Sequence, residues 1–258
     1  MLSKLMKYEF MAMGRVFLPM YGALLAITLV NRLLSLLPAR APMVISTVVA
    51  GILIAAIFII TFIFVVQRFR KNLLSYEGYL MMTLPVRTDS LILSKLFVAT
   101  IFNLVSLILA AFVVIILSGV EFGAVFYGLS NMFVDTPFQN GLLIFQFLIL
   151  TIFAVFFNTL LLYACMALSM LVNKHRGLFS FGAFVVITTV LQILTSLVIV
   201  LGIAFPGAEQ AINNFLNGLG NFAAGQVMMV FLMAGVLLGS AVFYFVTRYM
   251  LKRRLNLQ

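Results

Sequence analysis

The side chains that could do acid-base or metal chemistry are few in this chain, and they are scattered. Its 258 residues include six acidic residues, one histidine and one cysteine. A zinc site of the HExxH type needs two histidines one helical turn apart, so His175 alone excludes it. Cys165 lies inside an apolar run, where a packed thiol is the expected role, and a single cysteine forms neither a disulfide framework nor a CxxC metal site.

Patterns for nucleotide and nucleophile chemistry are also missing. The sequence contains no Gly-x-x-x-x-Gly-Lys-[Ser/Thr], so it has no phosphate-cradling loop, and any ATP would have to be bound by another chain. The stretch GLFSFG at 177–182 is not a Gly-x-Ser-x-Gly nucleophile elbow. We therefore predict that the chain is not itself an enzyme.

The surrounding elements are predicted to be membrane-spanning helices. The chain is 65% hydrophobic and 9% charged, with a mean hydropathy of +1.25, whereas a soluble domain is about half apolar and about a quarter charged. A span needs about 20 mostly apolar residues. We predict an all-α, polytopic fold forming a single transmembrane domain over 1–258. The six expected spans are 16–37, 43–66, 91–117, 142–171, 178–205 and 227–250.

Lysine and arginine set the orientation. Fourteen of the 16 basic residues fall in the amino-terminal segment, the segments after spans two and four, and the carboxyl end. Because cytoplasmic loops are rich in these residues, we predict that both termini are cytoplasmic. Asp89 and Asp135 then lie on opposite sides of the membrane, which excludes an aspartyl dyad.

Arg32 either snorkels to the outer interface or faces an internal cavity. Nucleic acid is not an expected partner, because the basic residues sit in short segments between spans.

Residues 1–14 predict an interfacial helix. Leu5, Phe10 and other apolar residues recur at helical spacing, while Lys4 and Lys7 lie on the opposite side, near anionic headgroups. Glu9 falls near the middle of the apolar face. A carboxylate there needs a partner or water, so the helix either packs against protein or frays.

The segment from Gln67 to Lys95 is the longest predicted cytoplasmic loop. A short amphipathic helix is expected over 72–84, ending before Pro85 and interrupted by Gly78. Glu77 sits on its apolar face. This helix either lies on the bilayer or docks on another protein, and we favour docking because the face holds a carboxylate and a glycine.

The stretch SYEGYLMMTLPV at 75–86 resembles the cytoplasmic loop of ABC exporter permeases of the second type, especially those of Gram-positive bacteria. The segments 7–10 (KYEF) and 173–177 (NKHRG) are similar to that family as well. The resemblance covers the whole chain in length and topology. It implies that 72–84 is a coupling helix inserted into a cleft on an ATP-hydrolysing subunit. The implied contact residues are Leu73, Tyr76, Glu77, Gly78, Tyr79, Leu80, Met81 and Leu84.

The resemblance also implies a bacterial plasma-membrane location and a set of partners. Two ATP-binding subunits would carry the ATP and magnesium, and a second permease subunit, identical or related, would complete the path, so this chain needs no cofactor. The cargo expected for a path of Phe, Leu and Met with a few amides is a hydrophobic or amphipathic peptide, lipid-like molecule or drug. The alternatives are a secondary transporter or channel, and a non-transporting immunity or sensory protein.

Polar residues inside the spans have two possible roles. Asn103, Asn158 and Gln192, like Gln146, either bond between helices or line a substrate path. No acidic residue lies within a predicted span, which weakens the proton-driven alternative. The apolar outer loop 206–225 is expected at the interface. By analogy with the resembled family it would hold an outer gate at Asn213, Asn214, Phe215 and Asn217.

Overall fold

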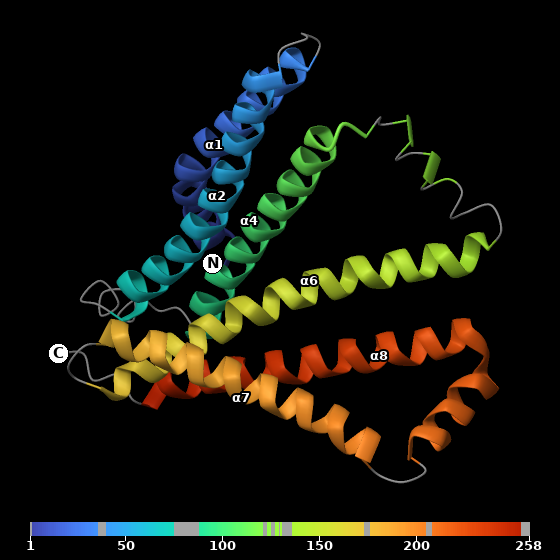
Figure 1. The fold of residues 1–258 in the computed structure, drawn as a ribbon. Helices are drawn as coiled ribbons and strands as arrows, with labels where there is room; N and C mark the ends of the chain where they lie inside the picture. Colours follow the sequence, from blue (N-terminus) through green and yellow to red (C-terminus); the bar gives the residue numbers. More distant parts are fainter. Residues whose placement is uncertain are drawn as a thin grey trace. The chain divides into compact units, whose positions relative to one another are not determined.

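The computed structural model of the chain is built from long helices (Figure 1). It describes residues 2–35, 40–74, 88–120, 123–124, 127–128, 130, 136–172, 176–204 and 208–253. Within these residues, all the regular structure is helical. The helices are α1 (Leu2–Leu34), α2 (Arg40–Leu74), α4 (Thr88–Leu117), α6 (Pro137–Leu168), the 3-10 helix η1 (Ser169–Leu171), α7 (Arg176–Ala204) and α8 (Ala208–Arg253).

Six of these helical segments are long and apolar enough to cross a membrane, and each overlaps one predicted span. The all-α, multi-pass fold predicted from the sequence is therefore confirmed. Helices satisfy every backbone N–H and C=O internally, which the hydrocarbon core requires. The segments are Leu5–Leu34, Ala41–Phe69, Asp89–Leu117, Phe138–Leu171, Gly177–Leu197 and Phe222–Lys252.

Local sequence explains several helix ends. Pro137 occupies the first position of α6, where its missing N–H costs no hydrogen bond. Asp89 lies in the first turn of α4, where a carboxylate interacts favourably with the positive end of the helix dipole. Gly119 follows the end of α4 with a φ of 72°, a left-handed conformation that glycine adopts without strain.

Three helix boundaries lie well away from those expected. Residues 1–14 were expected as a helix separate from span one, but α1 is continuous from Leu2 to Leu34. A single glycine, Gly14, is too weak a helix breaker to separate the two parts. Helix α2 continues past the expected end of span two to Leu74, because Gln67–Asn72 contains neither Gly nor Pro. Helix α8 begins at Ala208, within the predicted outer loop.

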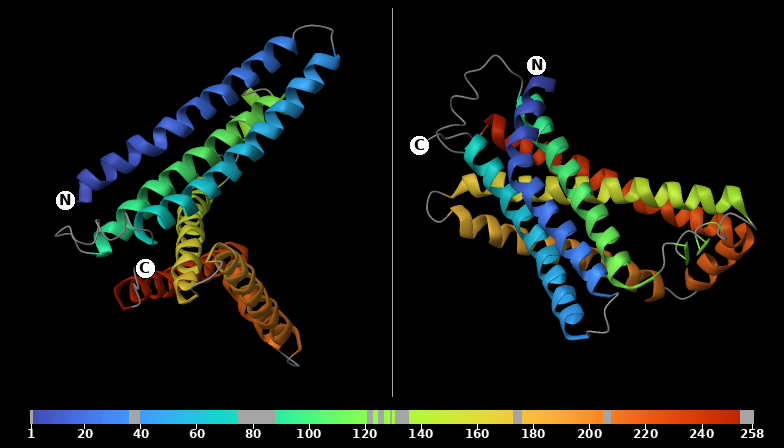
Figure 2. Two further views of the ribbon diagram at one scale, coloured as in Figure 1. Left: turned by 90° about the vertical axis from the view of Figure 1, so that its left-hand side faces the viewer. Right: turned by 90° about the horizontal axis from the view of Figure 1, so that it is seen from above.

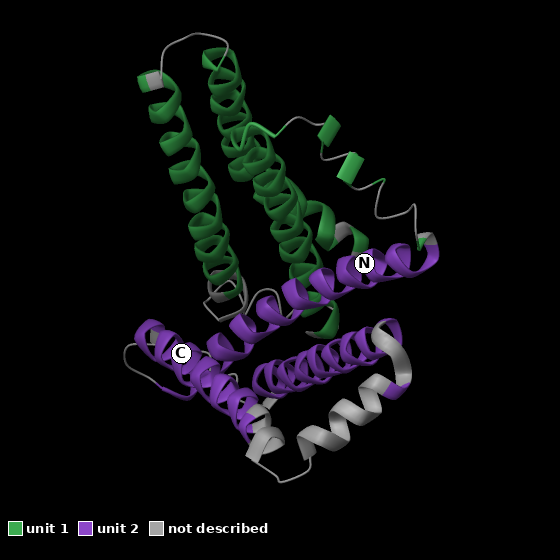
Figure 3. Cartoon of the chain, turned by 45° about the vertical axis from the view of Figure 1, so that its right-hand side comes forward, with its two compact units in different colours: residues 1–137 green, residues 138–258 purple. Residues whose placement is uncertain are grey.

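The chain divides into two compact units, residues 1–137 and 138–258 (Figure 3). A single domain was expected from the sequence, and that assignment stays a prediction.

In unit 1, helices α1, α2 and α4 run side by side (Figure 2, left). Their shared core is aromatic and centred on Phe17, which is fully buried. Its ring lies 5.2 Å from that of Phe102 on α4 and 5.9 Å from that of Phe64 on α2. Phe17 thus contacts both neighbouring helices, and edge-to-face or tilted rings at such spacings add to the packing energy.

In unit 2, helix α8 packs against α6 through a glycine. The rings of Phe157 on α6 and Phe243 on α8 lie 5.4 Å apart. A Cβ atom added at Gly239 would lie 2.6 Å from the Phe157 ring, so the ring occupies the space that a side chain at 239 would take. The sequence pattern Gly-x-x-x-Gly at 235–239 allows such a close approach of two helices. Only its second glycine makes it, since an added Cβ at Gly235 meets nothing within 4 Å.

Candidate functional site

A cluster of charged side chains in unit 1 joins helices α1, α2 and α4. The Glu9 carboxylate on α1 accepts hydrogen bonds from Arg68 of α2 and Lys95 of α4, one on each oxygen. We call these three residues the Glu9 ion cluster. The side chains of Glu9 and Lys95 are 11% and 4% exposed, and that of Arg68 is 25% exposed. Each carboxylate oxygen is therefore paired in a largely desolvated site.

The burial of this cluster makes its pairing obligatory. A charge removed from water is tolerated only when it is paired and hydrogen-bonded. Lys95 is buried and so depends on the Glu9 carboxylate as its counter-charge. The Arg68 guanidinium also lies 5.6 Å from the centre of the Phe64 ring, a cation–π arrangement. The sequence predicted that Glu9 needed a partner or water. The structure supplies protein partners, so α1 packs against protein at this residue.

The cluster also places three segments at one end of unit 1. Arg68 comes six residues before the end of α2, and Lys95 comes seven residues after the start of α4. The two cations flank the segment 75–87, and Glu9 joins them to the amino-terminal part of α1. The amino-terminal segment and the loop after span two were predicted to lie on the same side of the membrane, and the cluster agrees with that.

Most of the predicted docking residues fall outside the described residues. These are Tyr76, Glu77, Gly78, Tyr79, Leu80, Met81 and Leu84. Leu73 lies in the last turn of α2, where only its backbone is described. Lys4 and Lys7 lie on α1 with Glu9, and the Lys7 side chain is exposed. The coupling helix over 72–84 therefore stays a prediction.

The predicted path and gate residues are spread over both units. Asn103 is half-buried on α4 in unit 1, whereas Asn158 on α6 and Gln192 on α7 are exposed on unit 2. Gln146, the fourth amide named with these residues in the sequence analysis, bonds between helices: its Nε2 donates to Oε1 of Gln226 on α8, at 2.5 Å. The gate residues lie on the helical backbone at the start of α8, and they are Asn213, Asn214, Phe215 and Asn217.

Two polar contacts were not anticipated from the sequence. The Asn31 amide of α1 donates to Ser46 Oγ at 2.6 Å and to Thr47 Oγ1 at 2.9 Å, and so ties α1 to the start of α2. The Tyr21 hydroxyl pairs with Ser106 Oγ at 2.7 Å across α1 and α4. The only signal in the sequence was a polar residue in an apolar run, and that signal does not name the partner.

Arg32 lies in the last turn of α1 with an exposed side chain, which fits the expected snorkelling to an interface. Among the described residues, no three His, Cys, Asp or Glu side chains gather into a group that could hold a metal ion.

Comparisons with protein-family models, curated proteins and solved structures find no match for the chain.

Proposed function

We propose that the chain is the membrane-spanning permease subunit of an ABC exporter. It would move a hydrophobic or amphipathic substrate out of the cytoplasm, with ATP hydrolysed on a separate subunit. Two lines support the proposal. One is the resemblance of residues 75–86 to the coupling segment of such permeases. The other is the multi-pass fold of long apolar helices, which suits a transport subunit.

The observation that carries the proposal furthest is the position of the Glu9 ion cluster. It ties together the two helices that lead into and out of the segment 75–87. A force applied to that segment by a docked subunit would reach α2 and α4 together, and α1 with them. A flexible connection would absorb the same displacement locally, so a cross-linked base is what a coupling element needs.

In this proposal Glu77 and its neighbours contact the ATPase subunit. A second permease subunit, identical or related, would complete the path, with Asn103, Asn158 and Gln192 as candidate lining residues. The helical start of α8 would hold the outer gate.

The experiment is affinity purification of the tagged chain from its native membrane. The proposal predicts co-purification of a soluble protein that contains a phosphate-binding loop. Glu77→Arg is expected to reduce its recovery at least about tenfold while leaving membrane insertion unchanged, because the reversed charge opposes docking. The matched control is Glu209→Arg, the same change on the predicted outer side, which should leave recovery unchanged. Normal recovery with Glu77→Arg would contradict the coupling assignment.

A further inference from the structure

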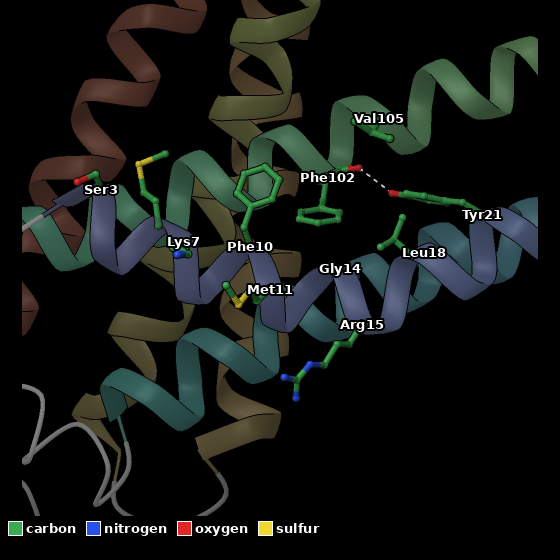
Figure 4. A pocket seen from close by; sticks show the side chains of 11 residues that line it. Ser3, Lys7, Phe10, Met11, Gly14, Arg15, Leu18, Tyr21, Phe102 and Val105 are labelled. Atoms are coloured by element: carbon green, nitrogen blue, oxygen red, sulfur yellow. Dashed lines mark hydrogen bonds between the residues drawn. The ribbon is translucent and has the colours of Figure 1, made fainter.

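A groove of about 740 Å³ lies along α1 beside α4 (Figure 4). Its lining comes from unit 1 alone, with residues of α1 from Ser3 to Tyr21 on one side and Phe102 and Val105 of α4 on the other. The groove is separate from the Glu9 ion cluster, none of whose members lines it.

The floor of this groove is apolar. The rings of Phe10 and Phe102 lie 5.2 Å apart across the two helices. The Tyr21 hydroxyl donates to the Phe102 carbonyl oxygen at 3.2 Å and pairs with Ser106 at 2.7 Å, so its polar atom is satisfied by protein. The floor therefore offers van der Waals contact to a hydrocarbon chain and leaves no polar atom of Tyr21 needing a ligand.

Two cations stand at the margin of the groove. Lys7 and Arg15 are both exposed, and eight residues separate them, which is about 12 Å along the helix. In Figure 4, Arg15 extends away from the aromatic rings. Glu9, the acidic residue nearest to them in sequence, is buried and engaged with Arg68 and Lys95. The margin is therefore positively charged above an apolar floor.

The predicted membrane depth of these residues matches the depths of a phospholipid's headgroup and acyl chains. Arg15 and Arg32 bracket the apolar part of α1 and lie about 25 Å apart along the helix, close to the thickness of the hydrocarbon core. Arg15 then lies at the headgroup level of one leaflet, the predicted cytoplasmic one. Leu18 and Tyr21 lie about 5 and 9 Å deeper, where an acyl chain would run.

We propose that this groove binds an anionic glycerophospholipid. Its phosphate would lie between Lys7 and Arg15, whose long side chains let both approach one headgroup, and one acyl chain would pack against Leu18, Phe102 and Val105. A zwitterionic lipid presents the same chains but no net charge, so the two cations select the anionic one. A basic residue near a membrane surface favours an anionic lipid by about fivefold.

The chain contains no tryptophan, so one introduced tryptophan is a clean reporter. Leu18→Trp places it in the groove, at a side chain that is 69% exposed. Ile59→Trp is the depth-matched control, because Ile59 and Leu18 each lie nine residues from a member of the Glu9 ion cluster along their own helices. Ile59 is 58% exposed and does not line the groove. Quenching is measured in vesicles with brominated phosphatidylglycerol or brominated phosphatidylcholine of identical chains.

We expect phosphatidylglycerol to quench the tryptophan at 18 at least about threefold more effectively than phosphatidylcholine, with no such preference at 59. Lys7→Gln with Arg15→Gln should remove the preference at 18. Equal quenching by the two lipids at 18, or the same preference at 59, overturns the proposal. Absence of quenching by either lipid also overturns it, because the groove is then covered by protein, such as a second copy of the chain.

Because tryptophan at 18 changes the groove itself, a second measurement uses the unaltered side chain there. Native mass spectrometry of the purified chain should show phosphatidylglycerol retained over phosphatidylcholine. The Lys7→Gln, Arg15→Gln variant should lose that retention. Equal retention of both lipids by the unaltered chain contradicts the proposal.

Discussion

At the scale of single residues, Glu9 shows how a charge on an apolar face directs packing. Its partners Arg68 and Lys95 lie 59 and 86 residues away in the sequence. Removing one member of a buried charge group leaves the others desolvated and unpaired, which is strongly destabilising. Replacing the whole group by apolar side chains of similar volume costs much less free energy. The cluster therefore fixes how α1, α2 and α4 fit together at this end of unit 1.

Glu9→Gln is expected to destabilise the chain by about 3 kcal/mol, because Lys95 is left buried beside a neutral amide. The measurement is unfolding in lipid-free detergent micelles by titration with a denaturing surfactant, so that a lipid bound at Lys7 does not contribute. Lys7→Gln is the matched control on the same helix: its side chain is exposed, so a change within about 0.5 kcal/mol is expected. Equal stability of the Glu9 and Lys7 variants would contradict a structural role for the cluster.

A double substitution distinguishes the loss of the Glu9–Lys95 ion pair from the cost of leaving Lys95 buried and unpaired. Glu9→Leu combined with Lys95→Met removes both buried charges and should recover part of the lost stability compared with Glu9→Leu alone, since no unpaired ammonium remains.

At the scale of elements, the packing of α8 on α6 depends on the missing side chain at Gly239. Phe157 fills the space next to this glycine and also contacts Phe243. A side chain at 239 would have to displace an aromatic ring.

Gly239→Ala is therefore expected to destabilise unit 2 by about 1 to 3 kcal/mol, the usual range for overpacking. Phe157→Leu in the same chain should relieve the clash and recover part of that loss. Gly235→Ala, one helical turn earlier, meets open space and should be neutral or slightly stabilising. Surfactant titration of the three variants checks this, and a Gly235→Ala variant as unstable as Gly239→Ala would refute the packing argument.

The elements were largely predictable from the sequence, because a span is a long uncharged run. The six spans follow from composition alone, and each was confirmed as a helix long and apolar enough to cross a membrane. Helix ends were less predictable. Helix α2 continues to Leu74 through a polar segment in which no Gly or Pro marks an end. Long-range partners were beyond reach, since neither Glu9 nor Asn31 carries a local signal that names Arg68 or Ser46.

At the scale of the whole molecule, each of the two compact units holds three of the six candidate spans. The sequence contains no Gly-x-x-x-x-Gly-Lys-[Ser/Thr]. The proposed exporter function accordingly assigns ATP binding to another subunit. An ion-driven transporter or channel would need none. This difference separates the proposed exporter subunit from its main alternative.

The most direct test is reconstitution of the purified chain in vesicles, with and without the ATPase subunit that co-purifies with it. The readout is movement of a fluorescent hydrophobic amphiphile across the vesicle membrane. We predict movement only when both subunits and magnesium ATP are present. Movement by this chain alone, driven by an ion gradient or by the amphiphile's own gradient, would contradict the account.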